Sequence, residues 1–307
     1  MIDVKRVFFR LLIAFSAALV ALFFVKTFFF EFCNVTTGSM EVTLLVGDRL
    51  LIDKFSHNFK LKRGAVITFV DPEFEYADNS LLSFVQRNFL LGLGRPNVFC
   101  KRVIGLPGDF IYGVLDQGEP KIFVNGVLLK EKYLNTFPLL NIWVCDPTKA
   151  AEIVSKVSKK DAFRLMRHFV KGRSYDISKP LNKQPFYQIN PKSIVRLDDG
   201  APSMTFPKIP LMNVLMGQPL VCPFWEGSDV FCIKLKSDEY WVMGDNRCGS
   251  YDSRAWGPVK KKFIVGTAVG IMWSADTDMH SWFWSLLNDP IKFLQSIRLS
   301  RTFSRIC

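Results

Sequence analysis

The pattern of hydrophobic and polar positions begins with one long apolar run near the N-terminus. Residues 7–32 are almost continuously apolar, and the fifteen residues 11–25 carry no charge between Arg10 and Lys26. This run is long enough to predict a helix that crosses a membrane, with the two cations reaching its surfaces. No small-residue cleavage site follows it, so we expect an uncleaved anchor rather than a removed signal sequence.

Beyond this run, short apolar segments separated by turn residues predict a β-rich body. The segment KIFVNGVLL places Asn125 and Gly126 between two apolar runs, which is a strong signal for a hairpin. In CKRVIGLPGDF, residues 100–110, Val103 and Ile104 indicate a strand, and the Leu-Pro-Gly-Asp that follows indicates a tight turn.

Residues 146–170 show a helical pattern instead. Asp146 can cap the start of a helix, Pro147 suits its first turn, and apolar residues recur at helical spacing, namely Ile153, Val154, Val157, Leu165, Met166 and Phe169. We therefore predict a basic, partly helical insertion over residues 146–220, which contains no motif that indicates a function.

Two shorter apolar stretches, residues 80–94 and the tail 281–307, are too short to span a bilayer. Each can either lie at a membrane surface or pack against the β body. The tail carries aromatic and cationic residues of the kind found among lipid headgroups, namely Trp282, Trp284, Lys292, Arg298, Arg301 and Arg305.

The charge of the chain favours a lipid surface as its partner. Forty Lys and Arg against 28 Asp and Glu give a formal charge of +12, and basic residues flank both ends, so we expect lipid rather than nucleic acid. Lys5, Arg6 and Arg10 precede the apolar run. By the positive-inside rule, the N-terminus is then cytoplasmic and everything after residue 32 lies outside the cytoplasm.

Ser39 is the first candidate for chemistry. It stands in TTGSM, residues 36–40, a sequence that equally suits a simple turn from the anchor into a strand. Only seven residues separate Ser39 from Phe32, so the chain can carry it roughly 25 Å from the anchor at most. A reaction at Ser39 would therefore act on something delivered by the bilayer.

Lys101 is the second candidate. A lysine that starts an apolar strand is usually a surface residue whose ammonium reaches the solvent. If Lys101 were buried beside Ser39, however, desolvation would lower its pKa from about 10.4 towards 7 or 8 and make it a general base. The third informative stretch, MGDNRCGSYDSRAWGPV at residues 243–259, suits a loop held by Asp–Arg pairs.

Other site chemistries are not favoured. The histidines His57, His168 and His280 stand in no catalytic-looking context, and the seven cysteines show no metal-ligand spacing, so we expect no metal or cofactor. Cys222 and Cys232 can pair across a hairpin in an oxidising compartment, although the sequence does not establish this connectivity.

In this order, behind an anchor, the segments TGSM, GDRLLIDKF, RGAVITF, KRVIGLPGD and GDNRCGSYDSRAWGPV resemble the conserved boxes of the bacterial type I signal peptidases. The resemblance implies a mainly antiparallel β fold and a serine endopeptidase of the inner membrane that removes signal peptides from exported precursors. It also implies small side chains at the first and third positions before the cut, and it leaves the translocation machinery open as a further partner.

The resemblance assigns roles residue by residue. Ser39 is the nucleophile, neutral Lys101 is its base, and the Thr37 hydroxyl joins the Ser39 N–H in the oxyanion hole. Ser250 orients the lysine, and structural roles in the site walls fall to Asp245, Asp252 and Arg254. A tethered, inactive protein that binds signal peptides or anionic lipid is the alternative, and it predicts no acyl intermediate.

Three departures from the family pattern leave local details open. Val42 replaces a usual proline, Ala65 replaces an aspartate, and Cys248-Gly249 replaces an Asp-Asn pair. These leave open the acidic partners of Arg102 and Arg254. The predicted division is an anchor at 1–32, a catalytic β domain at 33–145 and 221–275, the insertion at 146–220, and a basic aromatic tail at 276–307.

Overall fold

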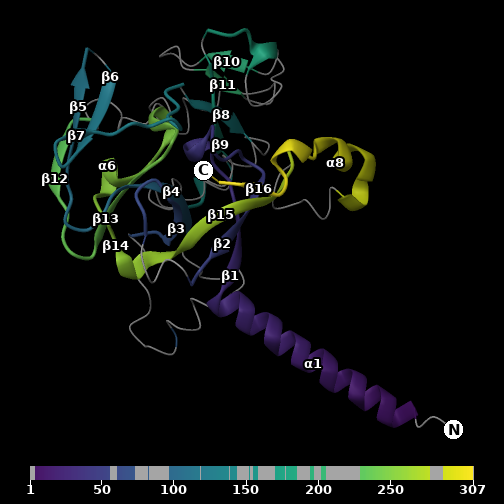
Figure 1. The fold of residues 1–307 in the computed structure, drawn as a ribbon. Helices are drawn as coiled ribbons and strands as arrows, with labels where there is room; N and C mark the ends of the chain where they lie inside the picture. The colour runs from purple at the N-terminus through teal and green to yellow at the C-terminus, as the bar shows by residue number, and fades with distance from the viewer. Residues whose placement is uncertain are drawn as a thin grey trace.

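The computed structural model describes residues 4–55, 61–72, 82, 97–117, 119–137, 139–143, 152, 155–157, 170–176, 178–184, 194–196, 202–204, 229–276 and 286–306. These residues form a β-rich body from which one long helix projects (Figure 1). Among the described residues, all pairs of named strands but one are antiparallel. The predicted mainly antiparallel β fold with an N-terminal apolar helix is confirmed.

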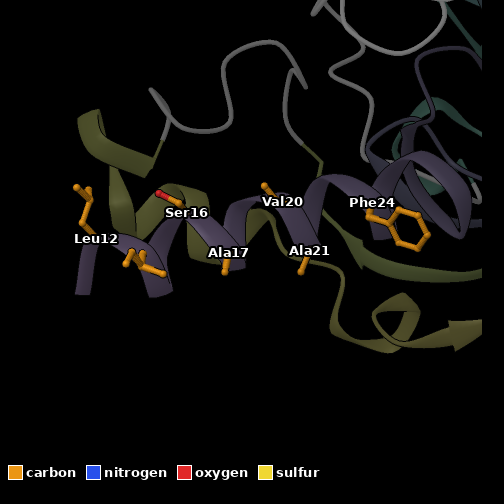
Figure 2. Close-up of a pocket in the computed structure, with 7 residues that line it drawn as sticks. Leu12, Ser16, Ala17, Val20, Ala21 and Phe24 are labelled. Atoms are coloured by element: carbon orange, nitrogen blue, oxygen red, sulfur yellow. The ribbon is translucent and has the colours of Figure 1, made fainter. Parts of the chain in front are cut away.

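The projecting helix is α1 (Val4–Phe28). Within it Val7–Phe28 has a mean hydropathy of 2.4 and is not covered by the rest of the protein, so it is long and apolar enough to cross a membrane. Its side chains line a shallow hollow that includes the small residues Ser16, Ala17 and Ala21 (Figure 2). The helix passes almost directly into the first strand of the body.

The largest sheet has eight strands, in the order β1-β2-β15-β3-β4-β13-β14, with β16 paired to β15. In β2 buried and half-buried residues alternate, as expected of a strand with one face towards the core, whereas every residue of β3 is buried. Fully burying an aliphatic side chain such as Leu50 or Ile52 stabilises the fold by about 1.5–3 kcal/mol. The strands are β1 (Phe30–Asn34), β2 (Asp48–Asp53), β3 (Val66–Val70), β4 (Val98–Gly105), β13 (Glu239–Met243), β14 (Val259–Lys260), β15 (Ile264–Ser274) and β16 (Ser304–Arg305).

A second sheet of four strands contains the predicted hairpin. Its order is β12-β5-β6-β7, and the connection between β6 and β7 is Asn125-Gly126. Both residues have positive φ, 51° and 81°, which is the conformation that makes Asn-Gly the preferred hairpin turn. The strands are β5 (Phe110–Asp116), β6 (Glu119–Val124), β7 (Val127–Leu128) and β12 (Phe231–Lys234).

A third sheet draws on the region predicted as an insertion. Its order is β10-β11-β8-β9, and only β11 and β8 run parallel. The described part of residues 146–220 thus includes strands, while most of the predicted helix at 146–170 lies outside the described residues. The strands are β8 (Leu139–Trp143), β9 (Val170–Ser174), β10 (Ile194–Arg196) and β11 (Pro202–Met204). The partly helical insertion and the domain boundaries stay predictions.

Short helical turns connect these strands, and two of them carry site residues. They are η1 (Gly38–Met40), η3 (Leu181–Lys183), η5 (Arg247–Gly249), α6 (Ser253–Trp256) and η6 (Lys261–Phe263).

The C-terminal segment forms α8 (Pro290–Ser296) and η7 (Leu299–Arg301) before it reaches β16. Phe293 is buried against Trp273, and Arg301 donates to the fully buried carboxylate of Asp48 at 2.6 Å. Arg298 lies 3.8 Å from the same carboxylate. These two arginines therefore pack on the β body, one of the two arrangements that the sequence left open for the tail. Trp282, Trp284 and all of the stretch 80–94 except Leu82 lie outside the described residues.

Candidate active site

Ser39 lies in η1, the turn that joins β1 to β2, and its side chain is buried. The turn is closed by hydrogen bonds from the N–H of Glu41 to the carbonyl of Gly38 and from the N–H of Leu44 to that of Met40. Gly38 is required by close packing, because a Cβ there would lie 2.2 Å from the carbonyl oxygen of Gly172 in β9. The turn is thus held in a fixed place between two sheets.

Lys101 extends from β4 to the same point. Its side chain is 4% exposed, and its Nζ lies 2.8 Å from the Oγ of Ser39 and 3.2 Å from the carbonyl oxygen of Cys100. The structure therefore brings together the two residues that the sequence singled out, although they are 62 positions apart in the chain. The arrangement is that of a hydroxyl and an amine that share one hydrogen bond in a buried place.

The surroundings of Lys101 favour the neutral amine. Burial lowers the pKa of Lys101, and the negative charge of Asp252 opposes this shift only in part. A neutral amine carries a lone pair and can accept the proton of Ser39. The neighbouring thiol of Cys100 does not compete as a nucleophile, because burial raises its pKa and keeps it protonated.

Thr37 lies two residues before Ser39 in extended backbone. Its side chain is exposed, and its Oγ1 lies 3.3 Å from the Oγ of Ser39. The hydroxyl of Thr37 and the N–H of Ser39 thus stand on the same short segment as the nucleophilic oxygen. An oxyanion that forms beside Ser39 could meet both donors.

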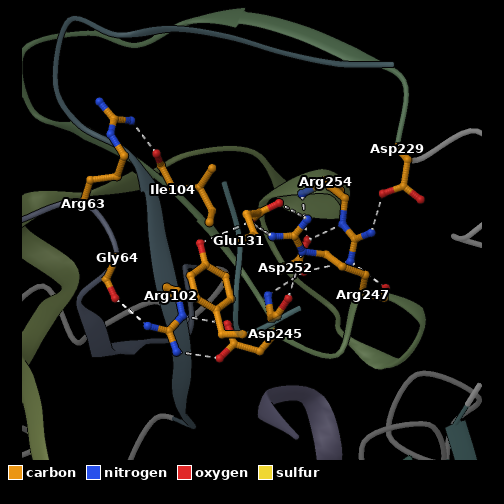
Figure 3. A network of polar contacts seen from close by, with 12 residues as sticks. Arg63, Gly64, Arg102, Ile104, Glu131, Asp229, Asp245, Arg247, Asp252 and Arg254 are labelled. Atoms are coloured by element: carbon orange, nitrogen blue, oxygen red, sulfur yellow. Dashed lines mark hydrogen bonds and ion pairs between the residues drawn. The ribbon is translucent and has the colours of Figure 1, made fainter. Parts of the chain in front are cut away.

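A network of ion pairs supports the loop after β13 (Figure 3). Arg102, next to Lys101 in β4, donates to both carboxylate oxygens of Asp245 at 2.8 and 2.7 Å, and also to the carbonyl of Gly64. Arg102 and Asp245 are almost completely buried. This bidentate pair fixes the end of β13 against β4, and it gives Arg102 the acidic partner that the sequence left open.

A second pair lies within the loop itself. Arg254 in α6 donates to Asp252 at 2.9 Å and to Asp229 at 2.7 Å, so this arginine also has acidic partners (Figure 3). Burial alone would raise the pKa of Asp252, but Arg254 and the N–H of Gly244 hold it below its usual value. Asp252 therefore stays negatively charged in the interior, near Lys101.

Ser250 is buried beside Gly244, where an added Cβ would lie 2.2 Å from the Ser250 Oγ. This hydroxyl helps to lower the pKa of Asp252 but makes no hydrogen bond of ordinary geometry within the described part of the chain. The predicted bond from Ser250 to Lys101 is therefore not formed in this structure. Its role in orienting the lysine stays a prediction.

The sequence did not identify two other residues that hold the site. Asn246 donates from its N–H to the carbonyl of Ser39 at 3.1 Å and from its Nδ2 to the carbonyl of Gly38 at 3.0 Å. Glu131 pairs with the buried side chain of Arg247 (Figure 3). Asn246 stands in the segment GDNR and could have been noticed there, whereas Glu131 belongs to no motif.

The described residues include no group of three His, Cys, Asp or Glu side chains that could hold a metal ion. All three histidines and Cys222 lie outside the described residues, and Cys232 is exposed in β12. The pairing of these two cysteines therefore stays open. The chemistry available at Ser39 is that of a hydroxyl, an amine and nearby hydrogen-bond donors.

Comparison with known proteins matches this chain to one family. The model of the family described as signal peptidase, peptidase S26, matches residues 8–176 and 216–273. Signal peptidase I of Buchnera aphidicola subsp. Schizaphis graminum is 27% identical over 288 residues, which cover 91% of this chain and 79% of that protein. Signal peptidase I P of Bacillus subtilis subsp. natto is 26% identical over 266 residues, covering 86% and 88%.

A crystal structure of a signal peptidase I from Enterococcus faecalis V583 is 20% identical in sequence and covers 68% of this chain and 96% of its own. The TM-score is 0.25, which is too low to compare the two folds in detail.

Proposed function

Because the chain belongs to the signal peptidase family, peptidase S26, we propose that Ser39 is its nucleophile and neutral Lys101 the general base in the removal of signal peptides. The observation that carries this proposal is the distance of 2.8 Å between Lys101 Nζ and Ser39 Oγ in a buried place. A serine hydroxyl is a weak nucleophile until an adjacent base takes its proton. A lysine can be that base only if burial keeps it neutral.

The proposed reaction has two halves. The Oγ of Ser39 attacks the carbonyl carbon of the peptide bond at the end of the signal peptide while Lys101 takes the hydroxyl proton. The N–H of Ser39 and the hydroxyl of Thr37 stabilise the oxyanion. When the C–N bond breaks, Lys101 returns the proton to the amine of the mature protein, and the signal peptide remains as an ester on Ser39. Water then attacks this ester while Lys101 takes its proton, and as the bond to Oγ breaks, Lys101 returns that proton to Ser39 and the signal peptide leaves as an acid.

The substrate and the location belong to the same proposal. The peptide bond that is cut has small side chains at the first and third positions before it. It belongs to precursors that arrive through the bilayer. The helix α1 anchors the protein in the bacterial inner membrane with its N-terminus in the cytoplasm, which the basic residues before the span support. The β body then meets the precursor on the outer face, near the translocation machinery.

A cleavage assay tests this proposal. The purified full-length protein in detergent is mixed with one exported precursor, and mass spectrometry identifies the products. We expect a single cut at the end of the signal peptide for the parent protein and none for Ser39→Ala of equal thermal stability. Binding of the precursor without cleavage by the parent protein would contradict the proposal, as would unchanged cleavage by Ser39→Ala.

A further inference from the structure

Glu41 is a buried acidic residue to which the proposed reaction gives no role. It lies two residues after Ser39, and its side chain is 1% exposed. Its Oε2 accepts a hydrogen bond from the backbone N–H of Ser174, the last residue of β9. A carboxyl group in the interior is costly unless hydrogen bonds or charges offset its desolvation. The contact between Glu41 and Ser174 thus joins two segments that are 133 residues apart in the chain.

Ser174 is the centre of the contact. It is fully buried, and its Oγ accepts hydrogen bonds from the Nδ2 of Asn135 at 2.5 Å and of Asn246 at 3.0 Å. A hydroxyl that accepts two bonds still has one proton to donate. The side chain of Ser174, as well as its N–H, interacts with the carboxyl of Glu41 and lowers its pKa.

The same network returns to the other side of Ser39. The Nδ2 that Asn246 directs at Ser174 also donates to the carbonyl of Gly38 at 3.0 Å. Ser174 is thus linked to the residue before Ser39 through Asn246, and to Glu41 directly. With Gly38 packed on the carbonyl of Gly172, β9 contacts the segment around Ser39 directly at Gly38 and Glu41, and indirectly through Asn246.

The carboxyl of Glu41 is an acceptor in either protonation state. Burial raises the pKa of Glu41 to about 7, while the hydrogen bonds from Ser174 and the positive charges of Arg173 and Arg298 act in the opposite direction. Whether ionised or protonated, the group retains an oxygen that can accept the N–H of Ser174.

We propose that Glu41 and Ser174 are positioning residues that hold Ser39 at hydrogen-bond distance from Lys101, with β9 as the fixed support of the nucleophile turn. This inference rests on the proposed roles of Ser39 and Lys101. It assigns a function to a strand within residues 146–220, where the sequence offered none. A shift of the nucleophile by about 1 Å is enough to lower a rate about 100-fold.

The test measures kcat and KM of the full-length protein in detergent for Glu41→Leu, Ser174→Ala and the double variant, with Glu119→Leu as a matched control. Glu119 is an exposed glutamate of β6. We expect kcat to fall about 10- to 100-fold in each single variant, with KM and the unfolding temperature nearly unchanged. Glu41→Gln, which keeps an acceptor for the N–H of Ser174, should retain more activity than Glu41→Leu. The double variant should lose no more than Glu41→Leu alone, because both changes break one network.

Parent rates in both single variants would overturn the inference, and so would a change confined to KM. If Glu41→Leu does not fold, Ser174→Ala decides, since it removes one oxygen atom only. These outcomes are distinct from failure of the proposed function, in which the parent protein itself would leave the precursor uncut.

Discussion

At the scale of single residues, Lys101 determines how activity should depend on pH. Burial lowers its pKa, and only the neutral amine can take the proton of Ser39. We therefore expect kcat to fall as the pH drops through the lowered pKa, because the ammonium that forms has no lone pair. A pH–rate profile of the parent protein, with a precursor that has no titrating group near the cut, measures this acidic limb. A profile with no acidic limb over the pH range in which the protein stays folded would be inconsistent with a lysine base.

The hydroxyl of Thr37 makes a separate prediction. Thr37→Val keeps the shape of the side chain and removes one oxyanion donor, which should lower kcat by about 10² to 10³. Thr37→Ser should be nearly silent. KM should move little in both variants, because the bond strengthens only in the transition state. Steady-state kinetics decide the matter, and a Thr37→Val variant with the parent kcat would show that the threonine is only a turn residue.

Individual residues differ in how far the sequence could identify them. Ser39 and Lys101 were found because each stands in a recognisable motif, and the structure places them in contact. Ser174 could not be found, because its segment has no motif and its partner Glu41 is far away in sequence. Ser250 was expected to bond Lys101, but its hydroxyl instead lies near Asp252. Such contacts depend on packing between segments, which residue patterns do not encode.

At the scale of elements, the pair of Arg102 and Asp245 joins β4 to the loop after β13. Removing one partner of a buried ion pair leaves the other charge uncompensated and costs about 3–5 kcal/mol. Asp245→Ala should therefore lower the unfolding temperature by many degrees and reduce cleavage, since Arg102 is next to Lys101. Glu152→Ala is the control, because its pair with Lys156 is largely exposed. Circular dichroism on heating measures the unfolding temperature of each variant. Equal unfolding midpoints for Asp245→Ala and Glu152→Ala would contradict this role.

Some elements follow from local chemistry and others do not. The Asn125-Gly126 turn was predictable because its positive φ angles demand those residue types. The strand β9, with the sequence VKGRS, has no alternation of apolar and polar residues, so its place in a sheet depends on β8. For the tail, the sequence left two alternatives open, a place at the membrane surface and packing against the β body. The buried carboxylate of Asp48, far away in sequence, pairs with Arg298 and Arg301 and holds both on the body.

At the scale of the whole molecule, the long apolar run made α1 predictable from its length and hydropathy alone. The proposed topology makes a direct prediction. Protease added to spheroplasts should digest the body beyond residue 32 and spare the N-terminus. If the body were protected in intact spheroplasts and digested only after lysis, the orientation would be opposite to the proposed one.

The anchor should matter more for substrate access than for chemistry. A variant without α1, lacking residues 1–28, should still cleave a soluble peptide, because β1, Ser39 and Lys101 all remain in the β body, but it should process a membrane-embedded precursor poorly. The ratio of the two rates in detergent and in vesicles measures this. Equal loss of both activities would show that α1 supports the fold of the site.

The central claim is that Ser39, activated by Lys101, carries the signal peptide as an ester. Acid quenching of the purified protein during turnover, followed by mass spectrometry of its peptides, tests it most directly. The account predicts the mass of the signal peptide added to the segment that contains Ser39, and neither ester nor product with Lys101→Arg, whose guanidinium stays protonated. Product formed at the parent rate by Lys101→Arg, or an ester found on another residue, would contradict it.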